Sequence, residues 1–157
     1  MRESTTVRIV LQRVSSASVA VDGEIFSRIG AGVCLFVGIA PEDSDADVDA
    51  AVAKIATLRI FADDAQKMNL SLGDVGAEVL VVSQFTLYGD VRRGRRPSFT
   101  GAAVPEIAEP LIDRMVEAFR TYGLEATQGV FGAKMAVELV NDGPVTLVLD
   151  VSGGIVA

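Results

Sequence analysis

The 157-residue chain contains no histidine at all. Ser-His-Asp and Cys-His catalysis are therefore excluded, and so are most zinc sites. The GxxxxGK[ST] phosphate loop and the GxGxxG dinucleotide fingerprint are also absent. Any reaction must rely on backbone groups, hydroxyls, carboxylates, lysines or the substrate itself, and we expect neither a metal nor a cofactor.

Cysteine is nearly absent too: Cys34 is the only one, and it lies in the apolar run VCLFV at 33–37. No disulfide can form within the chain, which is typical of a reducing compartment. Because no histidine can activate the thiol, we expect Cys34 to be a small buried apolar side chain and not a nucleophile.

Membrane and export signals are missing as well. No apolar run approaches the roughly 20 residues that a membrane-spanning helix needs. The N-terminus lacks the charged-then-apolar pattern of a signal peptide. We therefore expect a cytoplasmic protein that makes no membrane contact.

The net charge of −7 argues mildly against nucleic acid as a partner, since phosphate contacts favour basic surfaces. The charges are unevenly distributed, however. Acidic residues gather at 42–49, whereas four arginines lie together beyond Gln84: Arg92, Arg93, Arg95 and Arg96. An isolated run of this kind is most simply a solvated loop, but its place after a polar strand end favours contact with phosphate.

Length and composition are those of a folded domain, because half of the 157 residues are hydrophobic and no linker or repeat is present. We predict a single domain over 1–157, with tails at 1–6 and 152–157. Apolar runs bounded by turn residues predict strands. These strands are expected at 7–14, 17–21, 24–29, 33–39, 78–84, 124–128, 136–140 and 145–151.

Apolar residues at helical spacing predict two main helices. The first begins at Ser44 or Asp45 and places Val48, Val52 and Ile55 on one face. The second covers 105–122, although Pro110 predicts that regular helix begins only there. The fold class is therefore mixed α/β, with more strand than helix.

Polar residues follow the predicted buried strand at 78–84. The run SQFTL occupies 83–87, where the backbone N–H groups of a strand end can turn toward a ligand. Amides placed in this way can stabilise the oxyanion of an acyl-transfer reaction, a contribution of about 3 kcal/mol per donor.

A second run, NDGPVT at 141–146, lies between two apolar, alternating stretches. Proline cannot donate a hydrogen bond in a sheet, so it belongs at a strand start or an edge. A Gly-Pro bond in a tight place is one of the few peptide bonds that can be cis at modest cost, and such a site can aim two carbonyl oxygens at a ligand. Taken alone, the run is more simply an ordinary turn at a strand entry.

Together the two runs resemble the D-aminoacyl-tRNA deacylase family, in which SQxxT-type and NxGPxT-type motifs occur in this order and at about this spacing. The resemblance spans nearly the whole chain. It implies three-layer, barrel-like β-sheets with two main helices, and a homodimer whose active site lies at the subunit interface. Further landmarks of the family are LQRVS at 11–15, KMNLS at 67–71, GRRPSF at 94–99, and FGA at 131–133 followed by Met135.

The resemblance also implies a substrate, namely tRNA whose terminal adenosine carries a D-amino acid, or glycine mischarged on tRNA(Ala). Hydrolysis of the ester releases the free amino acid and tRNA, which is chiral proofreading in translation. The family relies on the ribose 2′-hydroxyl beside the ester, and a histidine-free chain is compatible with that. The residues implied in catalysis are Ser83, Gln84, Phe85 and Thr86.

Two of these residues have alternative roles. Gln84 either orients the ester or satisfies a hydrogen bond at the strand end. Thr86 is a conceivable nucleophile, but the local sequence offers no base to activate its hydroxyl, so a positioning role is favoured.

The resemblance implies that rigid backbone excludes L-amino acids. We therefore expect the Gly143-Pro144 bond to be cis, with its two carbonyls, supplied by the opposite subunit, holding the α-amino group so that an L side chain clashes and a D side chain does not. Glycine would pass this filter. Arg13 either braces the segment or forms an ordinary surface ion pair. The implied substrate-binding residues are Asn141, Gly143, Pro144, Val145, Thr146, Ala133 and Met135, and the implied supporting or tRNA-binding residues are Arg13, Arg95 and Arg96.

A different class of function uses the same scaffold. A non-catalytic module that binds nucleic acid would account for the arginines, because a fold does not by itself secure a function. A binding module would need neither of the two motifs, so their joint presence favours the enzyme.

Overall fold

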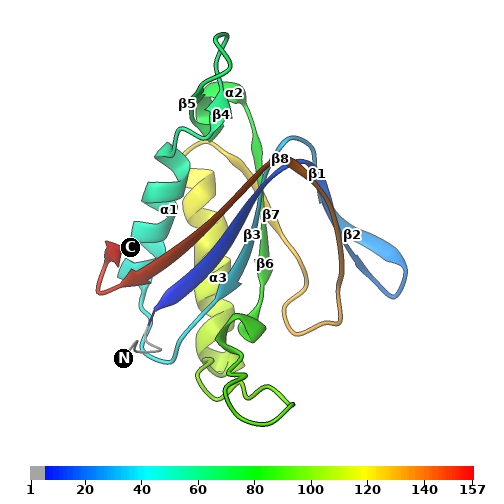
Figure 1. Ribbon diagram of the computed structural model, residues 1–157, viewed down its shortest axis with the longest axis vertical. Coiled ribbons are helices and arrows are strands. Elements are labelled where there is room, and N and C mark those ends of the chain that lie inside the picture. The colour runs from blue at the N-terminus through cyan, green and yellow to red at the C-terminus, as the bar shows by residue number, and fades with distance from the viewer. Residues whose placement is uncertain (1–5) are drawn as a thin grey trace.

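A single curled sheet organises the computed structural model, which describes residues 6–157 (Figure 1). Its strands follow the order β7-β6-β3-β1-β8-β9, and β2 pairs with β1 off this path. The pairs β3–β6 and β6–β7 are parallel, whereas β1 is antiparallel to all of its partners. The strands are β1 (Val7–Val21), β2 (Glu24–Ile29), β3 (Gly32–Gly38), β6 (Glu78–Ser83), β7 (Glu125–Gln128), β8 (Ala136–Ser152) and β9 (Ile155–Val156).

The helices are few, and two of them cover one face of this sheet. They are α1 (Asp45–Thr57) and α3 (Pro105–Thr121), which lie side by side in Figure 1 and are linked by Arg114 and Asp49. The small elements are α2 (Leu72–Val75), a 3-10 helix η1 (Phe85–Tyr88), and a separate two-stranded sheet of β4 (Phe61–Ala62) and β5 (Met68–Leu70). The structure confirms the predicted mixed α/β class, as a curled half-barrel with few helices.

Two apolar clusters lie on the two faces of the sheet. The larger one, between sheet and helices, joins alternate residues of β1 such as Ile9 and Leu11 to Ile55 of α1 and Phe119 of α3. The smaller one, on the other face, contains Val14, Ala17, Val19, Ile29, Cys34, Leu80 and Val82. Cys34 is fully buried there, and burial raises the pKa of its thiol to about 12, which confirms the prediction of a buried apolar side chain.

Helix α3 begins at Pro105, so the prediction that regular helix starts only at Pro110 was wrong. Proline suits the first position of a helix, where its missing N–H has no intrahelical partner. Pro110 lies on the exposed side of the helix, and the helix continues through it.

Strands β1 and β8 are each continuous where the sequence predicted two strands. The predicted tail at 152–157 was also wrong, because β9 folds back on β8 with Val151 opposite Val156. This hairpin is held from α1, since the Gly154 amide donates to the Asp47 carboxylate at 2.7 Å. Of the predicted tail at 1–6, only Thr6 belongs to the described residues, and it is buried.

No helix of the described residues is both long enough and apolar enough to cross a membrane.

Candidate functional site

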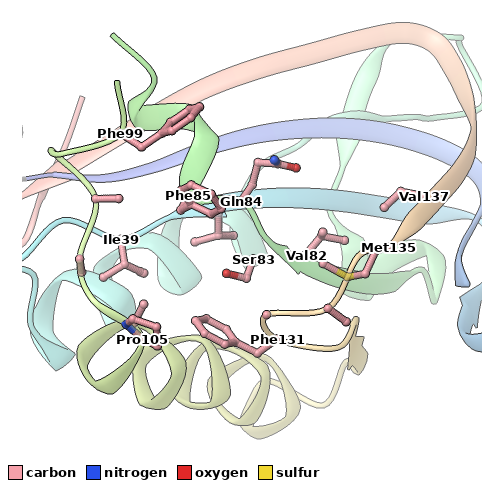
Figure 2. A pocket seen from close by; sticks show the side chains of 16 residues that line it. Ile39, Val82, Ser83, Gln84, Phe85, Phe99, Pro105, Phe131, Met135 and Val137 are labelled. Carbon is pink, nitrogen blue, oxygen red and sulfur yellow. The ribbon is translucent and has the colours of Figure 1, made fainter. Parts of the chain in front are cut away.

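A cavity of about 490 Å³ lies where β3 and β6 end. Figure 2 shows Ser83 and Met135 directed into it, with Phe131 and Pro105 on the side of α3. None of the described side chains that line it is ionisable. The lining consists of Val37, Ile39, Val82, Ser83, Gln84, Phe85, Phe99, Ala102, Ala103, Pro105, Ala108, Phe131, Gly132, Ala133, Met135 and Val137.

The backbone at the end of β6 forms one wall of this cavity. Ser83 pairs with Val37 of β3, and the Gln84 amide donates to the Val37 carbonyl at 2.8 Å. The chain then turns sharply into η1. The first amides of a helix have no partner within it, and within residues 6–157 the amides of Phe85 and Thr86 donate no hydrogen bond. The turn therefore carries two N–H groups without a partner among residues 6–157, and its first residue, Phe85, lines the cavity.

Side chains at this turn contact one another and the arginine loop. The Gln84 amide group donates to the Thr86 hydroxyl. The rings of Phe85 and Phe99 meet edge to face, with centroids 5.2 Å apart. The Thr86 side chain is thus an acceptor that orients Gln84, and Thr86 itself does not line the cavity.

The opposite wall comes from the connection between β7 and β8. Ala133, Met135 and Phe131 line the cavity there, and a role of Ala133 and Met135 in substrate binding stays a prediction. Gly129 makes room for this arrangement, because a Cβ atom there would lie 2.6 Å from the sulfur of Met135. Sequence reasoning missed the third wall, at Ala102 and Pro105, where the only signal was apolar residues at the end of a polar loop.

The Gly143-Pro144 bond is cis, as predicted. It lies in a bulge of β8, because Val14 pairs with Asn141 and Gln12 with Thr146, which leaves 142–145 opposite one residue of β1, Arg13. Nearby, the hydroxyl of Thr146 is hydrogen-bonded to the side chain of Gln12.

Arg13 contacts this bulge directly. Its Nε donates to the Asp142 carbonyl at 3.0 Å, and its Nη1 donates to the Ile60 carbonyl at 2.5 Å. The Asp142 carboxylate lies 3.6 Å from Nε, so an ion pair accompanies the brace. Arg13 therefore contacts the backbone of the bulge and forms an ion pair at the same time.

The bulge and the cavity lie apart within one chain. Ser83 is level with Val37, Ile9 and Leu149 on successive strands, so the bulge opposite Arg13 is three strands across and four residues along. This separation corresponds to roughly 20 Å. None of residues 141–146 lines the cavity.

The arginine loop is closed by a bridge between Asp90 and Ser98. Arg92 is paired within the loop, since its Nε and Nη2 donate to Asp90 at 2.9 and 2.7 Å. These hydrogen bonds lower the pKa of Asp90 to about 2. Arg95 and Arg96 are exposed and form no ion pair within residues 6–157.

No cluster suited to a metal ion occurs among the described residues, taking three or more His, Cys, Asp or Glu side chains as the requirement.

Comparison with known proteins identifies the family. The model of the D-Tyr-tRNA(Tyr) deacylase family matches residues 10–150. The chain belongs to this family. A D-aminoacyl-tRNA deacylase of Thermomicrobium roseum is 58% identical over 92% of this chain and 94% of its own length. That of Chloroflexus aurantiacus is 56% identical over 92% and 90%.

Solved structures agree with this deacylase fold. A structure described as c-Myc DNA unwinding element binding protein is 42% identical, with a TM-score of 0.83 over 90% of this chain and 97% of that one. A probable eukaryotic D-amino acid tRNA deacylase, at 20% identity, has a TM-score of 0.80 over 92% and 99% and shows the shared fold alone.

Proposed function

We propose that this chain hydrolyses the ester bond of D-aminoacyl-tRNA, as the names of its relatives indicate for them. Family membership over residues 10–150 supports the activity. The observation that carries the proposal is a cavity that, within residues 6–157, has no ionisable side chain in its lining and adjoins a turn with two unpartnered amides. Such a site can bind an oxyanion but has no side chain to act as base.

The reaction follows from these groups. Water adds to the ester carbonyl carbon, and the amides of Phe85 and Thr86 stabilise the oxyanion that forms. The ribose 2′-hydroxyl of the substrate, beside the ester, assists the water and the leaving oxygen. The bond to the ribose oxygen then breaks, that oxygen takes one proton of the water, the other proton is released to solvent, and the amino acid leaves as its carboxylate. Thr86 has no adjacent base and acts by orienting Gln84.

The chirality filter is the Gly143-Pro144 bulge of a second copy of the chain. Within one chain the bulge is roughly 20 Å from the cavity, so it cannot complete its own site. The sheet face opposite the helices carries exposed apolar side chains, including Val148 at 63% exposure. Burial of this face in a homodimer would remove that apolar surface from water.

Sedimentation tests the homodimer. We expect the wild-type chain to sediment as a dimer and Val148→Glu to sediment as a monomer without release of D-tyrosine. Val75→Glu, on α2, is the matched control, because Val75 is also an exposed valine but lies on the helical side. A wild-type monomer with full activity would contradict the shared site.

Substrate range follows from the same filter. Glycine has no side chain to clash, so glycyl-tRNA, including glycine mischarged on tRNA(Ala), passes it. The exposed Arg95 and Arg96 supply phosphate contacts for the tRNA body.

The direct experiment compares the release of D-tyrosine and L-tyrosine from charged tRNA by the purified protein. We expect catalytic release of D-tyrosine and none of L-tyrosine above the spontaneous rate. Equal rates for the two enantiomers would contradict a chiral deacylase.

A second candidate function is binding of nucleic acid without catalysis. It is favoured by the 42% identical structure whose name refers to a DNA unwinding element. Binding of single-stranded DNA by a protein that releases no D-tyrosine would establish this function in place of the first.

A further inference from the structure

The last part of η1 rests on the sheet face opposite α1 and α3. Ile9 and Val37 point into the core with the helices, so their neighbours Arg8 and Gly38 point the other way. Asp150, Arg8 and Gly38 form one row across β8, β1 and β3. A Cβ atom on Gly38 would lie 3.0 Å from the ring of Tyr88 and 3.3 Å from both Leu87 and the Gln84 carbonyl.

Arg8, which lies in this row, contacts η1. Its Nε donates to the Asp150 carboxylate at 3.0 Å, and its Nη1 reaches the Leu87 carbonyl at 3.4 Å. Its guanidinium carbon lies 5.4 Å from the centre of the Tyr88 ring, within the range of cation–π attraction. One side chain therefore contacts two of the four residues of η1.

Tyr88 is the residue of η1 that packs against the sheet. Its ring is 7% exposed, and burial raises the pKa of its hydroxyl to about 12. The ring fits over Gly38 because that residue has no side chain. The C-terminal half of η1 is thus fixed, whereas Phe85, in its first turn, is 55% exposed.

We propose that Arg8, oriented by Asp150, is a positioning residue for the deacylase reaction. It holds the C-terminal end of η1 on the sheet and thereby fixes the direction of the free amides of Phe85 and Thr86 beside the cavity. A displacement of about 1 Å of such groups can cost roughly a hundredfold in rate. This role rests on the proposed function, since only an oxyanion needs those amides in one direction.

The test uses Arg8→Met and Arg8→Lys in the full chain. For Arg8→Met we expect kcat for D-tyrosyl-tRNA to fall by roughly tenfold to a hundredfold, with KM changed less than about threefold. Arg8→Lys keeps the charge but cannot contact Asp150 and Leu87 at once as the planar guanidinium does, so its kcat should lie between that of Arg8→Met and that of wild type. Amide hydrogen exchange of residues 84–89 should be faster in Arg8→Met, because the amides of Leu87 and Gly89 are hydrogen-bonded in the held turn.

Arg114→Met is the matched control. Arg114 pairs with Asp49 at 2.9 and 2.8 Å on the helical side and does not contact η1, so kcat and exchange at 84–89 should match wild type. Gly38→Ala provides a second perturbation if Arg8→Met does not fold. Its methyl group would press on Tyr88 and Leu87 with Arg8 intact, and kcat should fall with the same rise in exchange.

The proposal would be overturned if Arg8→Met kept its kcat, or if kcat fell without faster exchange at 84–89. Hydrogen exchange requires no substrate. If the wild-type protein failed to release D-tyrosine, the proposed function would fail, whereas exchange at residues 84–89 would still show whether Arg8 holds η1 on the sheet.

Discussion

Gly143→Ala is the substitution that probes the β8 bulge most sharply. Gly143 has a φ of +127°, a backbone conformation that side chains rarely adopt. An added Cβ atom would lie 2.9 Å from Nη2 of Arg13 and 3.0 Å from the amide nitrogen of Val145. The new methyl group would therefore strain the backbone and displace the guanidinium that braces it.

The expected loss has two parts. Backbone strain at such a φ costs about 1–3 kcal/mol. Displacing Arg13 weakens its hydrogen bond to the Asp142 carbonyl, and a hydrogen bond with one charged partner contributes about 1.5–3 kcal/mol. Gly123→Ala is the matched control, because Gly123 has a φ of +81° but no atom within 4 Å of an added Cβ. It should suffer the strain alone.

Urea unfolding and single-turnover release of D-tyrosine measure the two effects. We expect Gly143→Ala to lose at least about 1 kcal/mol more of the free energy of unfolding than Gly123→Ala. Its rate of D-tyrosine release should fall by at least about tenfold, whereas Gly123→Ala should keep the wild-type rate. Equal losses of stability and equal rates in the two variants would refute the role of the bulge.

Four further perturbations test the roles of Thr86, the ribose 2′-hydroxyl of the substrate, the exposed arginines and Asp43. Thr86→Ala should keep substantial activity, because it removes only the acceptor that orients Gln84; a loss as large as that from blocking the cavity would indicate a threonine nucleophile. A substrate ending in 2′-deoxyadenosine should react far more slowly, and an equal rate would exclude assistance by the substrate. Neutralising Arg95 and Arg96 should raise KM and reduce its salt dependence, which an unchanged salt response would contradict. Burial raises the pKa of Asp43 from 3.8 to about 6, so the stability that its protonated form contributes is full below pH 4 and is lost as the pH rises through 6. The free energy of unfolding in urea should therefore fall over this pH range by at most about 3 kcal/mol, and Asp43→Asn should not show this fall.

Local patterns predicted the elements that pack in regular ways. The apolar alternation of β1 and the helical spacing in α1 follow directly from burial on one face, and both elements formed. The second helix formed as well, but its start at Pro105 depended on proline at the first helical position and not on Pro110. The low helix propensity of a single proline is outweighed by the packing of a whole apolar helix face.

Long-range pairing could not be predicted from local sequence. The run at 141–146 contains turn residues, yet β8 continues through it because β1 pairs with β8 on both sides of the bulge. The C-terminal β9 formed for the same reason, with a partner supplied by β8 and a hydrogen bond from Gly154 to Asp47. Both features depend on contacts between residues far apart in the chain.

The candidate site divides in a similar way. Ser83, Gln84 and Phe85 of the motif line the cavity together with Ala133 and Met135, and their roles in catalysis and binding stay predictions. The walls at Ala102 and Pro105 went unpredicted, because small apolar residues in a loop have no distinctive pattern. Whether residues 141–146 complete the site in a dimer remains a prediction.

Mixing two inactive variants tests most directly the claim that one site is built from two copies. Ala133→Phe fills the cavity and leaves the bulge intact, whereas Gly143→Ala damages the bulge and leaves the cavity intact. In a two-fold dimer with random exchange of subunits, about a quarter of all sites would then combine an intact cavity with an intact bulge. The mixture should therefore recover about a quarter of the wild-type rate of D-tyrosine release. A mixture no more active than the average of the two variants, with subunit exchange verified, would contradict it.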